Sequence, residues 1–467
     1  MMVSQNRFNL RSAWVFILFI TYNLCFAQSH LSSVSDLENS SSLNIPNLSS
    51  VISNSFFSAQ EGFLVNLKGL TLNEVIERSL THDPLIRAGL ESINQAEAEV
   101  ITAGLLPNPT FLTNQELMPL THPYTPEQEG GPPQLNVAIE FPIDWFVFGK
   151  RAAAIIAAKK GVDVATANFY ELIRERIYGA ISAFYDALEA QAMLALAQES
   201  LGNFTAVEQY ILAQNKTIPS NNIRLERVRL SLFSSRQDVR DKKIKLIETI
   251  SRLRVFLGIK KPLDLNLAGQ LEVSTPLSPP SLEGAIAIAK ENRPDFLASQ
   301  YEITQAEAGI QLEKKQAYPE IIPYIGYNRQ FQRKVLNMPD ANSWQAGFQL
   351  DIPLFDRNQG NIAKMESIHT QAKLNLEAKI LELQAEVEQA LEAYQAAYET
   401  ITIEDPAKLK MAQNIRNRVH IDTHTFMEVI DAQEVYLETY QIHINNLSNY
   451  WHTLYAFNAA VGKQVLK

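Results

Sequence analysis

Two segments of the chain alternate strictly between apolar and polar residues, which is the pattern of a β-strand with one apolar face. The apolar positions of the first segment, Gln134 to Ile143, are Leu135, Val137, Ile139 and Phe141. Those of the second segment, Trp344 to Ile352, are Trp344, Ala346, Phe348, Leu350 and Ile352. Weaker alternation upstream of each, at Thr110 to Met118 and at Ile321 to Gln332, indicates a partner strand. The pattern therefore predicts two β-hairpins, at about residues 109–144 and about residues 319–354.

The predicted strands have the length and the two faces of strands that cross a bilayer, for which about ten residues suffice. We expect the apolar face to meet lipid through Leu135, Val137, Ile139, Phe141, Trp344, Phe348 and Leu350. The opposite face, which suits a water-filled lumen, carries Glu140, Gln345, Gln349 and Asp351. The alternative is a pair of small soluble sheets that cap a coiled coil, but this would leave Trp344 and Phe348 without cover.

Each predicted hairpin is followed by a long stretch of helix-forming residues, almost free of Gly and Pro in the first case. The predicted helices run from Gly149 to Asn215 and back from Asn222 to Gly258, then from Gly360 to about Val419 and back from Phe426 to Gly462. Helices of this length exceed the usual globular range, so we expect two coiled-coil hairpins, at about residues 149–258 and about residues 360–462.

The chain is an internal duplication. Thr71 to Pro109 matches Ser281 to Pro319 at a constant spacing of 210 residues (294 − 84), and Pro84 and Pro294 each divide a short helix from a longer one. Beyond this block the spacing becomes 211 (360 − 149), which pairs Gly149 with Gly360. The first structural repeat is therefore assigned to residues 64–270 and the second to residues 271–467.

The N-terminus has the composition of an export signal. Arg7 and Arg11 precede an apolar run, and Ala27 offers a small residue for cleavage. We expect a signal peptide at residues 1–27 and a flexible leader, rich in Ser and Asn, at residues 28–63. The only cysteine is Cys25. Lipidation of Cys25 stays an open alternative, although Leu24 before it departs from the lipoprotein pattern.

Four barrel strands per chain cannot close a membrane barrel, because the smallest barrels need about eight strands. Two chains would supply eight strands, and side chains would fill the interior of a barrel of that size. Three chains supply twelve strands and leave room for a pore. The polar face of the strands therefore favours a homotrimer.

The net charge of −10 and the absence of enzyme motifs exclude other classes. A general nucleic-acid binder would need a basic face. The sequence contains no nucleophile elbow, phosphate-binding loop, zinc-protease motif or dinucleotide fingerprint, so we expect neither an enzyme nor a bound cofactor. No apolar run of about 18 residues follows the signal peptide, so no transmembrane helix is predicted there.

The duplicated order of paired helices, strand hairpin and long helical hairpin resembles the outer membrane efflux proteins of the TolC family. The motif that carries the resemblance is Arg418, followed by Asp422, Thr423, Phe426 and the run Glu428-Val429-Ile430-Asp431-Ala432-Gln433. The strand end Leu350-Asp351-Ile352-Pro353-Leu354-Phe355 is also similar to that family. The resemblance covers essentially the whole chain beyond the leader.

The resemblance implies a mainly α-helical fold with a membrane β-barrel. Three chains would form a twelve-stranded barrel in the cell outer membrane, continued by an α-helical tunnel through the periplasm. It also implies passive export of a cargo that an inner-membrane pump, of the RND type, delivers through a periplasmic adaptor protein.

Residues near the two helical turns are candidates for function. The resemblance implies that the turns contact the adaptor through Lys216, Thr217, Asp422 and Thr423. Glu428 and Asp431 lie three residues apart and hence on one helix face, so with Arg418 they are candidates for a gate at the periplasmic mouth. A solvated helix face is the alternative. His420 and His424 are candidate metal ligands if their segment is helical.

A periplasmic coiled-coil adaptor or structural protein without a pore is the alternative function. Adaptors usually carry one helical hairpin between small β domains, whereas this chain has two helical hairpins that each follow a pair of strands. The sequence leaves the cargo open among drugs, divalent metals and proteins.

Overall fold

The computed structural model describes residues 69–127, 130–215, 222–260, 266–269, 271–273, 275–418 and 426–466, all within one unit, Ser58–Lys467. The predicted signal peptide and leader lie outside the described residues, and so do Cys25, Lys216, Thr217, His420, Asp422, Thr423 and His424. None of the described helices is both long enough and apolar enough to cross a membrane.

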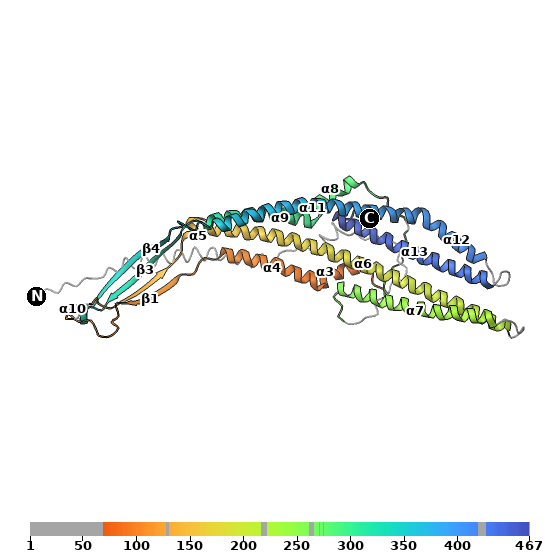
Figure 1. The fold of residues 1–467 in the computed structure, drawn as a ribbon, viewed down its shortest axis with the longest axis horizontal. Coiled ribbons are helices and arrows are strands. Elements are labelled where there is room, and N and C mark those ends of the chain that lie inside the picture. The colour runs from red at the N-terminus through yellow and green to blue at the C-terminus, as the bar shows by residue number, and fades with distance from the viewer. Residues whose placement is uncertain are drawn as a thin grey trace. The chain divides into compact units, whose positions relative to one another are not determined.

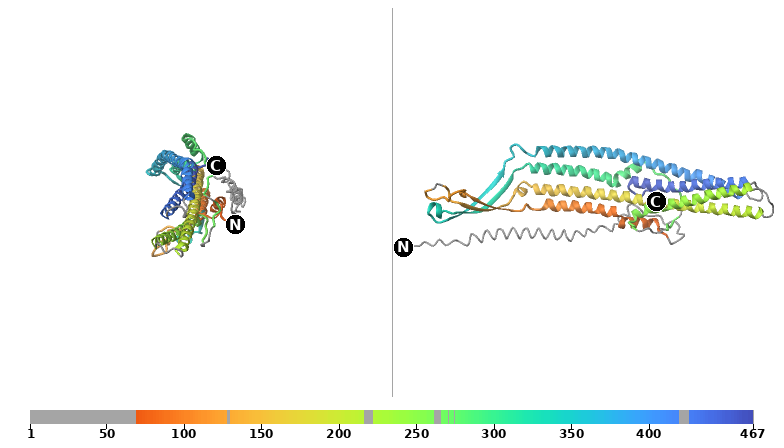
Figure 2. Two further views of the ribbon diagram at one scale, coloured as in Figure 1. Left: turned by 90° about the vertical axis from the view of Figure 1, so that its right-hand side faces the viewer. Right: turned by 60° about the horizontal axis from the view of Figure 1, so that its bottom comes forward.

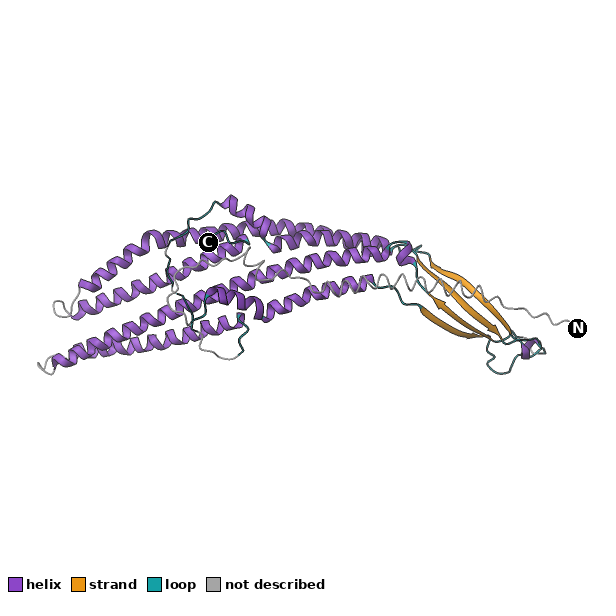
Figure 3. Ribbon diagram, turned by 180° about the vertical axis from the view of Figure 1, so that it is seen from behind, coloured by secondary structure: helices purple, strands orange, loops and turns teal. Residues whose placement is uncertain are grey.

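The four predicted strands join into one antiparallel sheet (Figure 3). In sheet order they are β1 (Thr110–Glu116), β2 (Gln134–Glu140), β3 (Glu320–Gln330) and β4 (Ala341–Asp351). The two repeats meet at the β2–β3 pair, where Val137 lies opposite Tyr327. Hydrogen bonding continues past the end of β2, since the N–H of Ile143 donates to the carbonyl of Ile321 at 2.9 Å. β1 ends before the predicted Met118 because Leu117 adopts a positive φ of 56°, outside the extended region.

Four helices continue from the strands and lie side by side (Figure 2). In spatial order they are α4 (Pro84–Gly104), α6 (Lys150–Asn215), α9 (Pro294–Gln316) and α11 (Gln359–Glu399). α4 and α9 begin at the predicted prolines, where the missing N–H removes no helical hydrogen bond. Shorter helices are α3 (Leu72–His82), α5 (Asp144–Val147) and α8 (Leu282–Asn292), and α10 (Arg333–Leu336) connects β3 to β4.

The far ends of the long helices form the two predicted helical hairpins (Figure 1). α7 (Asn222–Phe256) returns along α6, and α13 (Phe426–Val461) packs between α6 and the outgoing helix of the second repeat. Ile430 of α13 is buried with Val228 and Leu232 of α7 and with Phe204 of α6. α7 and the outgoing helix of the second repeat are thus the two edges of this helical layer.

The second outgoing helix is not the continuous helix that the sequence predicts. A π-helical turn, η1 (Thr400–Glu404), separates α11 from α12 (Asp405–Arg418). Pro406 explains the interruption, because proline has no N–H to donate and its ring clashes with the preceding turn of an α-helix. The first repeat has no proline at the corresponding place in α6, which runs through 66 residues.

The predicted equivalence of Gly149 and Gly360 is also wrong. Gly360 lies inside α11, whereas the residue just before that helix is Asn358, with a positive φ of 60°. Gly149 has a φ of 69° and immediately precedes α6. The residues that match in backbone conformation are therefore Gly149 and Asn358, 209 positions apart (358 − 149). Asparagine tolerates the left-handed conformation better than most residues, which hides the match from a comparison of residue types.

Candidate functional site

The register of the sheet places the predicted lipid-facing residues on one face. Tyr327 of β3 lies opposite both Val137 and Trp344. Ile139 pairs with Phe111 on one side and with Ile325 on the other. Because directly opposite residues share a face, these side chains form an apolar surface that crosses all four strands.

The apolar face is exposed in the single chain. The side chains of Trp344 and Phe348 are 73% and 68% exposed. Leu135 and Leu350 follow the same register, opposite Arg329 and Ile321 respectively. Phe141 lies one residue past β2, where its N–H donates to the carbonyl of Pro323 at 3.2 Å. All seven residues predicted to meet lipid therefore belong to this face.

The other face of the sheet is polar and crowded. Asn328 donates to Gln134 at 3.1 Å and also to the side chain of Asn136. A Cβ added at Gly347 would lie 2.6 Å from the Tyr324 hydroxyl, and one added at Gly326 would lie 2.7 Å from the carbonyl of Val137. Crowding on one face with exposure on the other is what a curved sheet produces, with the polar side on the inside of the curve. Four predicted lumen residues, Glu140, Gln345, Gln349 and Asp351, lie on this polar face.

The predicted gate carboxylates lie on an exposed face of α13. Ile430 is buried against the first helical hairpin. Glu428, two residues before it, and Asp431, the residue after it, are exposed. Two further exposed carboxylates, Glu434 and Glu438, continue the same face at spacings of three and four residues. We call Glu428, Asp431, Glu434 and Glu438 the acidic stripe. α13 contains no Lys or Arg to offset it.

Sequence reasoning identified only half of the acidic stripe. The signal for Glu434 and Glu438 was their helical spacing from Asp431, but only the burial of α13 shows that they share its exposed face. Arg418, the third predicted gate residue, is the last residue of α12, and its side chain lies outside the described structure. The described residues contain no group of three or more His, Cys, Asp or Glu side chains that could hold a metal ion.

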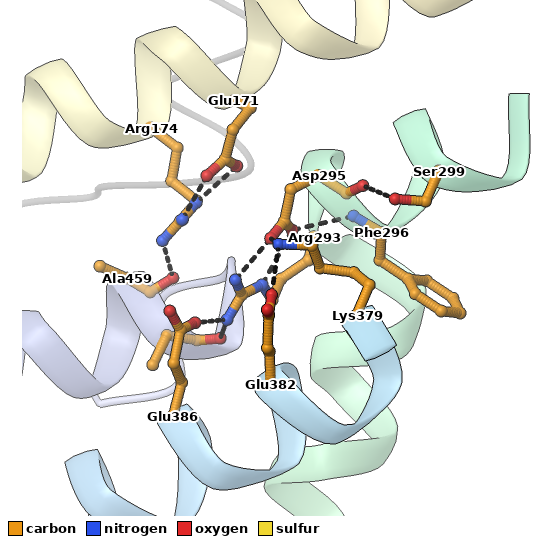
Figure 4. Close-up of polar contacts among 11 residues, drawn as sticks. Glu171, Arg174, Arg293, Asp295, Phe296, Ser299, Lys379, Glu382, Glu386 and Ala459 are labelled. Atoms are coloured by element: carbon orange, nitrogen blue, oxygen red, sulfur yellow. Dashed lines mark hydrogen bonds and ion pairs between the residues drawn. The ribbon is translucent and has the colours of Figure 1, made fainter. Parts of the chain in front are cut away.

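A buried ionic cluster that the sequence did not reveal holds the C-terminal end of α13 (Figure 4). Arg174 of α6 donates to the carbonyl of Ala459 at 2.7 Å, and Arg293 donates to that of Ala460 at 3.1 Å. These carbonyls belong to the last turn of a helix, where they lack intrahelical partners and where the helix dipole favours a cation. The two arginines thus anchor α13 to the junction of α8 and α9 and to α6.

Arg293 is the centre of this cluster. Its guanidinium, 2% exposed, contacts Asp295 at 2.6 Å and also pairs with Glu386 of α11. Lys379 of α11 approaches Asp295 at 3.7 Å. Burial by itself would raise the pKa of Asp295, but the hydrogen bond and the positive charge of Arg293 outweigh it, so the pKa of this carboxyl is lowered. The sequence showed Arg293 only as the residue before Pro294.

Comparison with known proteins agrees with the fold. Residues 285–450 match the family model described as "Outer membrane efflux protein". The cation efflux system protein CusC of Escherichia coli strain K12 is 25% identical over 268 residues, which are 56% of this chain and 58% of that protein. The cobalt-zinc-cadmium resistance protein CzcC of Cupriavidus metallidurans is 23% identical over 298 residues, 63% of this chain and 65% of that protein.

The match thus spans less than two thirds of the length of these curated relatives. Among solved structures, CusC superposes with a TM-score of 0.68 at 18% identity, covering 88% of this chain and 96% of that one. Over residues 285–450 the chain is similar to outer membrane efflux proteins, and its fold matches that of CusC. The predicted fold class, with long helices and four strands per chain, is confirmed.

Proposed function

We propose that three copies of this chain form the outer membrane channel of a tripartite efflux system. The channel passively conducts a cargo that an inner-membrane pump of the RND type and a periplasmic adaptor deliver to it. The observation that carries the proposal is the sheet, which has one exposed apolar face, one polar face and two open edges, β1 and β4. Such a sheet is a segment of a barrel wall, with lipid outside and water inside.

The two edges of the chain are complementary, which supports cyclic association. β1, α4 and α7 form one edge, and β4, α11 and α12 form the other. Each helical edge exposes apolar side chains in a single chain. Those of α7 include Leu230, Phe233, Ile244 and Ile247, and those of the opposite edge include Leu381, Ile403 and Met411. Joining β4 of one chain to β1 of the next would close twelve strands and cover these apolar faces.

Charge supports the same arrangement of edges. Residues 240–254 of α7 contain six Lys or Arg against two acidic residues. Residues 380–399 of α11 contain five Glu and no Lys or Arg. The two segments begin at similar distances from the ends of the helical hairpins. Residue 240 is 18 residues from the start of α7 (240 − 222), and residue 399 is 19 residues from the end of α12 (418 − 399). In a cyclic trimer the basic edge of one chain would meet the acidic edge of its neighbour.

We propose metal cations as the cargo. The acidic stripe on α13 would form rings of carboxylates in a trimer, and such rings attract cations and repel anions. The names of CusC and CzcC refer to cation efflux and to resistance to cobalt, zinc and cadmium. The proposed adaptor contacts are the helical turns with Lys216, Thr217, Asp422 and Thr423, and the proposed gate is Glu428 and Asp431 with Arg418.

A matched pair of substitutions on neighbouring residues of β4 tests the channel. Phe348→Lys places a charge on the apolar face and Gln349→Lys places the same charge on the polar face. A lysine at the bilayer midplane costs about 2–4 kcal/mol in barrel strands. We expect Phe348→Lys to be lost from the outer membrane fraction. Gln349→Lys should still assemble and form pores in planar bilayers with lower cation conductance. Recovery of the unmodified protein in soluble periplasm would refute the channel.

A further inference from the structure

The second helical hairpin contains a hinge that the first lacks. At η1 the N–H of Asp405 donates to the carbonyl of Thr400, five residues back, instead of four. Pro406 follows and cannot donate to the carbonyl of Thr402. π-helical turns and prolines are the common causes of helix kinks. The outgoing helix of the second repeat therefore has a defined position at which its axis can bend.

Threonine hydroxyls add hydrogen bonds at this position. Thr400 donates to the carbonyl of Ala396 at 2.9 Å, and Thr402 donates to that of Tyr398 at 2.7 Å. Such back-bonding offers helix carbonyls a second partner and often accompanies bending. The carbonyls of Ala396 and Tyr398 thus keep a hydroxyl donor when the backbone bends, which lowers the free energy required for bending.

A buried polar cluster lies directly beside the hinge. Asp405, at the junction of η1 and α12, is 4% exposed. One of its carboxylate oxygens accepts from Asn446 of α13 at 3.0 Å, and the other pairs with Nδ1 of His443, also on α13. Because a carboxylate oxygen accepts, Nδ1 of His443 carries the hydrogen. We call these three residues the Asp405 cluster.

The neighbouring side chains of the Asp405 cluster come from α12, α13 and η1. The ring of Tyr440 meets that of His443 edge-on at a centroid distance of 6.2 Å, and its hydroxyl accepts from Gln413 of α12 at 2.7 Å. Lys408 of α12 pairs with Glu404 at 2.8 Å on the exposed side. The Asp405 cluster and the hydrogen bond from Gln413 to Tyr440 therefore join α12 to α13, whereas the Lys408–Glu404 pair joins α12 to η1.

We infer that the Asp405 cluster is a positioning device for the channel mouth, an inference that rests on the proposed function. It holds the segment beyond the hinge against α13, which carries the acidic stripe. α12 has 14 residues and extends about 21 Å from the hinge toward the turn. A small bend at η1 thus becomes a displacement of several ångströms at the far end of α12. Release of Asp405 from His443 and Asn446 permits that bend and opens the mouth.

The first repeat provides the contrast. α6 continues through 66 residues without a π-helical turn, and one link between α6 and α7 is the ion pair of Arg229 with Glu208 at 3.3 Å, whose side chains are 51% and 22% exposed. An ion pair with one exposed partner contributes little to holding two helices together. Among the described residues the π-helical turn lies in the second hairpin, and we assign the opening movement to that hairpin.

Single-channel recording of the full-length protein in planar bilayers tests this inference. His443→Leu removes the donor to Asp405, and we expect the open probability to rise about tenfold, since hydrogen bonds to charged groups are among the stronger ones. His443→Asn restores a nitrogen donor near the position of Nδ1 and should return the open probability toward that of the unmodified protein. Pro406→Ala favours a continuous α-helix at the hinge and should lower the open probability.

The matched control is Glu208→Gln, which breaks the corresponding link in the first hairpin and should leave the open probability unchanged. Equal effects of His443→Leu and His443→Asn, or an unchanged open probability in both His443→Leu and Pro406→Ala, would overturn the positioning role while the pore itself remains. Absence of any pore from the unmodified protein would instead refute the proposed function. Pro406→Ala leaves the cluster intact, so it reports on the hinge even if His443→Leu fails to fold.

Discussion

Arg293 and Glu386 form an ion pair in the second repeat, and the first repeat has an ion pair at the corresponding positions with the charges exchanged. The first pair is Asp83 and Arg176, in contact at 2.7 Å. Members of both pairs lie 93 residues apart, and in both the earlier residue directly precedes the proline that starts α4 or α9. The later residue lies on the long helix of the same repeat. The duplication therefore preserved the position of the ion pair and exchanged its charges, which satisfies the same electrostatic requirement.

The two links should contribute unequally to stability. Asp83 is completely buried, so Arg176→Met would leave a buried carboxylate without its cation, at a cost of about 3–5 kcal/mol. The side chain of Glu386 is 56% exposed, and Arg293 keeps Asp295 and the carbonyl of Ala460 without it. Glu386→Gln should therefore cost about 1 kcal/mol or less. Thermal melting of the detergent-solubilised protein compares the variants, and equal losses would contradict this difference.

Acid should weaken the cluster around Arg293. The lowered pKa of Asp295 means that the folded state binds this proton less readily than the unfolded chain, whose carboxyl has a pKa of 3.8. The stabilisation is therefore complete above pH 3.8 and is lost as the pH falls through the lower pKa of the folded state. Melting temperatures measured between about pH 6 and pH 2 should fall more for the unmodified protein than for Asp295→Asn. Parallel curves would show that Asp295 contributes nothing to the acid sensitivity.

Neutralising the acidic stripe should change ion selectivity. Glu428→Gln with Asp431→Asn removes two carboxylates per chain from the proposed mouth, and six from a trimer. We expect higher conductance or a lower preference for cations in planar bilayers. Adding Glu434→Gln and Glu438→Gln should enlarge the effect. Glu226→Gln on α7 removes an exposed charge near the other turn and serves as the control. Unchanged conductance and selectivity in the fourfold variant would refute the gate.

The alternation from Gln134 to Ile143 and from Trp344 to Ile352 was sufficient to predict the strands and their two faces. A period of two residues leaves only one way to place the apolar side chains together. The long helices were predictable for a similar reason, because Gly and Pro are scarce over many consecutive residues. Pro406 shows the limit of this reasoning. A single proline inside a helical pattern signals a break, but the π-helical turn that accommodates it depends on Thr400, Thr402 and the buried Asp405.

By itself the sequence determined the duplication, the order of the elements and the apolar face of the sheet, because these follow from local periodicity. The tertiary structure alone decided which residues from distant segments meet. Arg293 with Glu386, Asp405 with His443, and the exposure shared by Glu428 and Glu438 all depend on how helices pack side by side. Helix packing sets the rotation of each helix about its axis, and that rotation determines whether a charged residue is buried with a partner or is exposed.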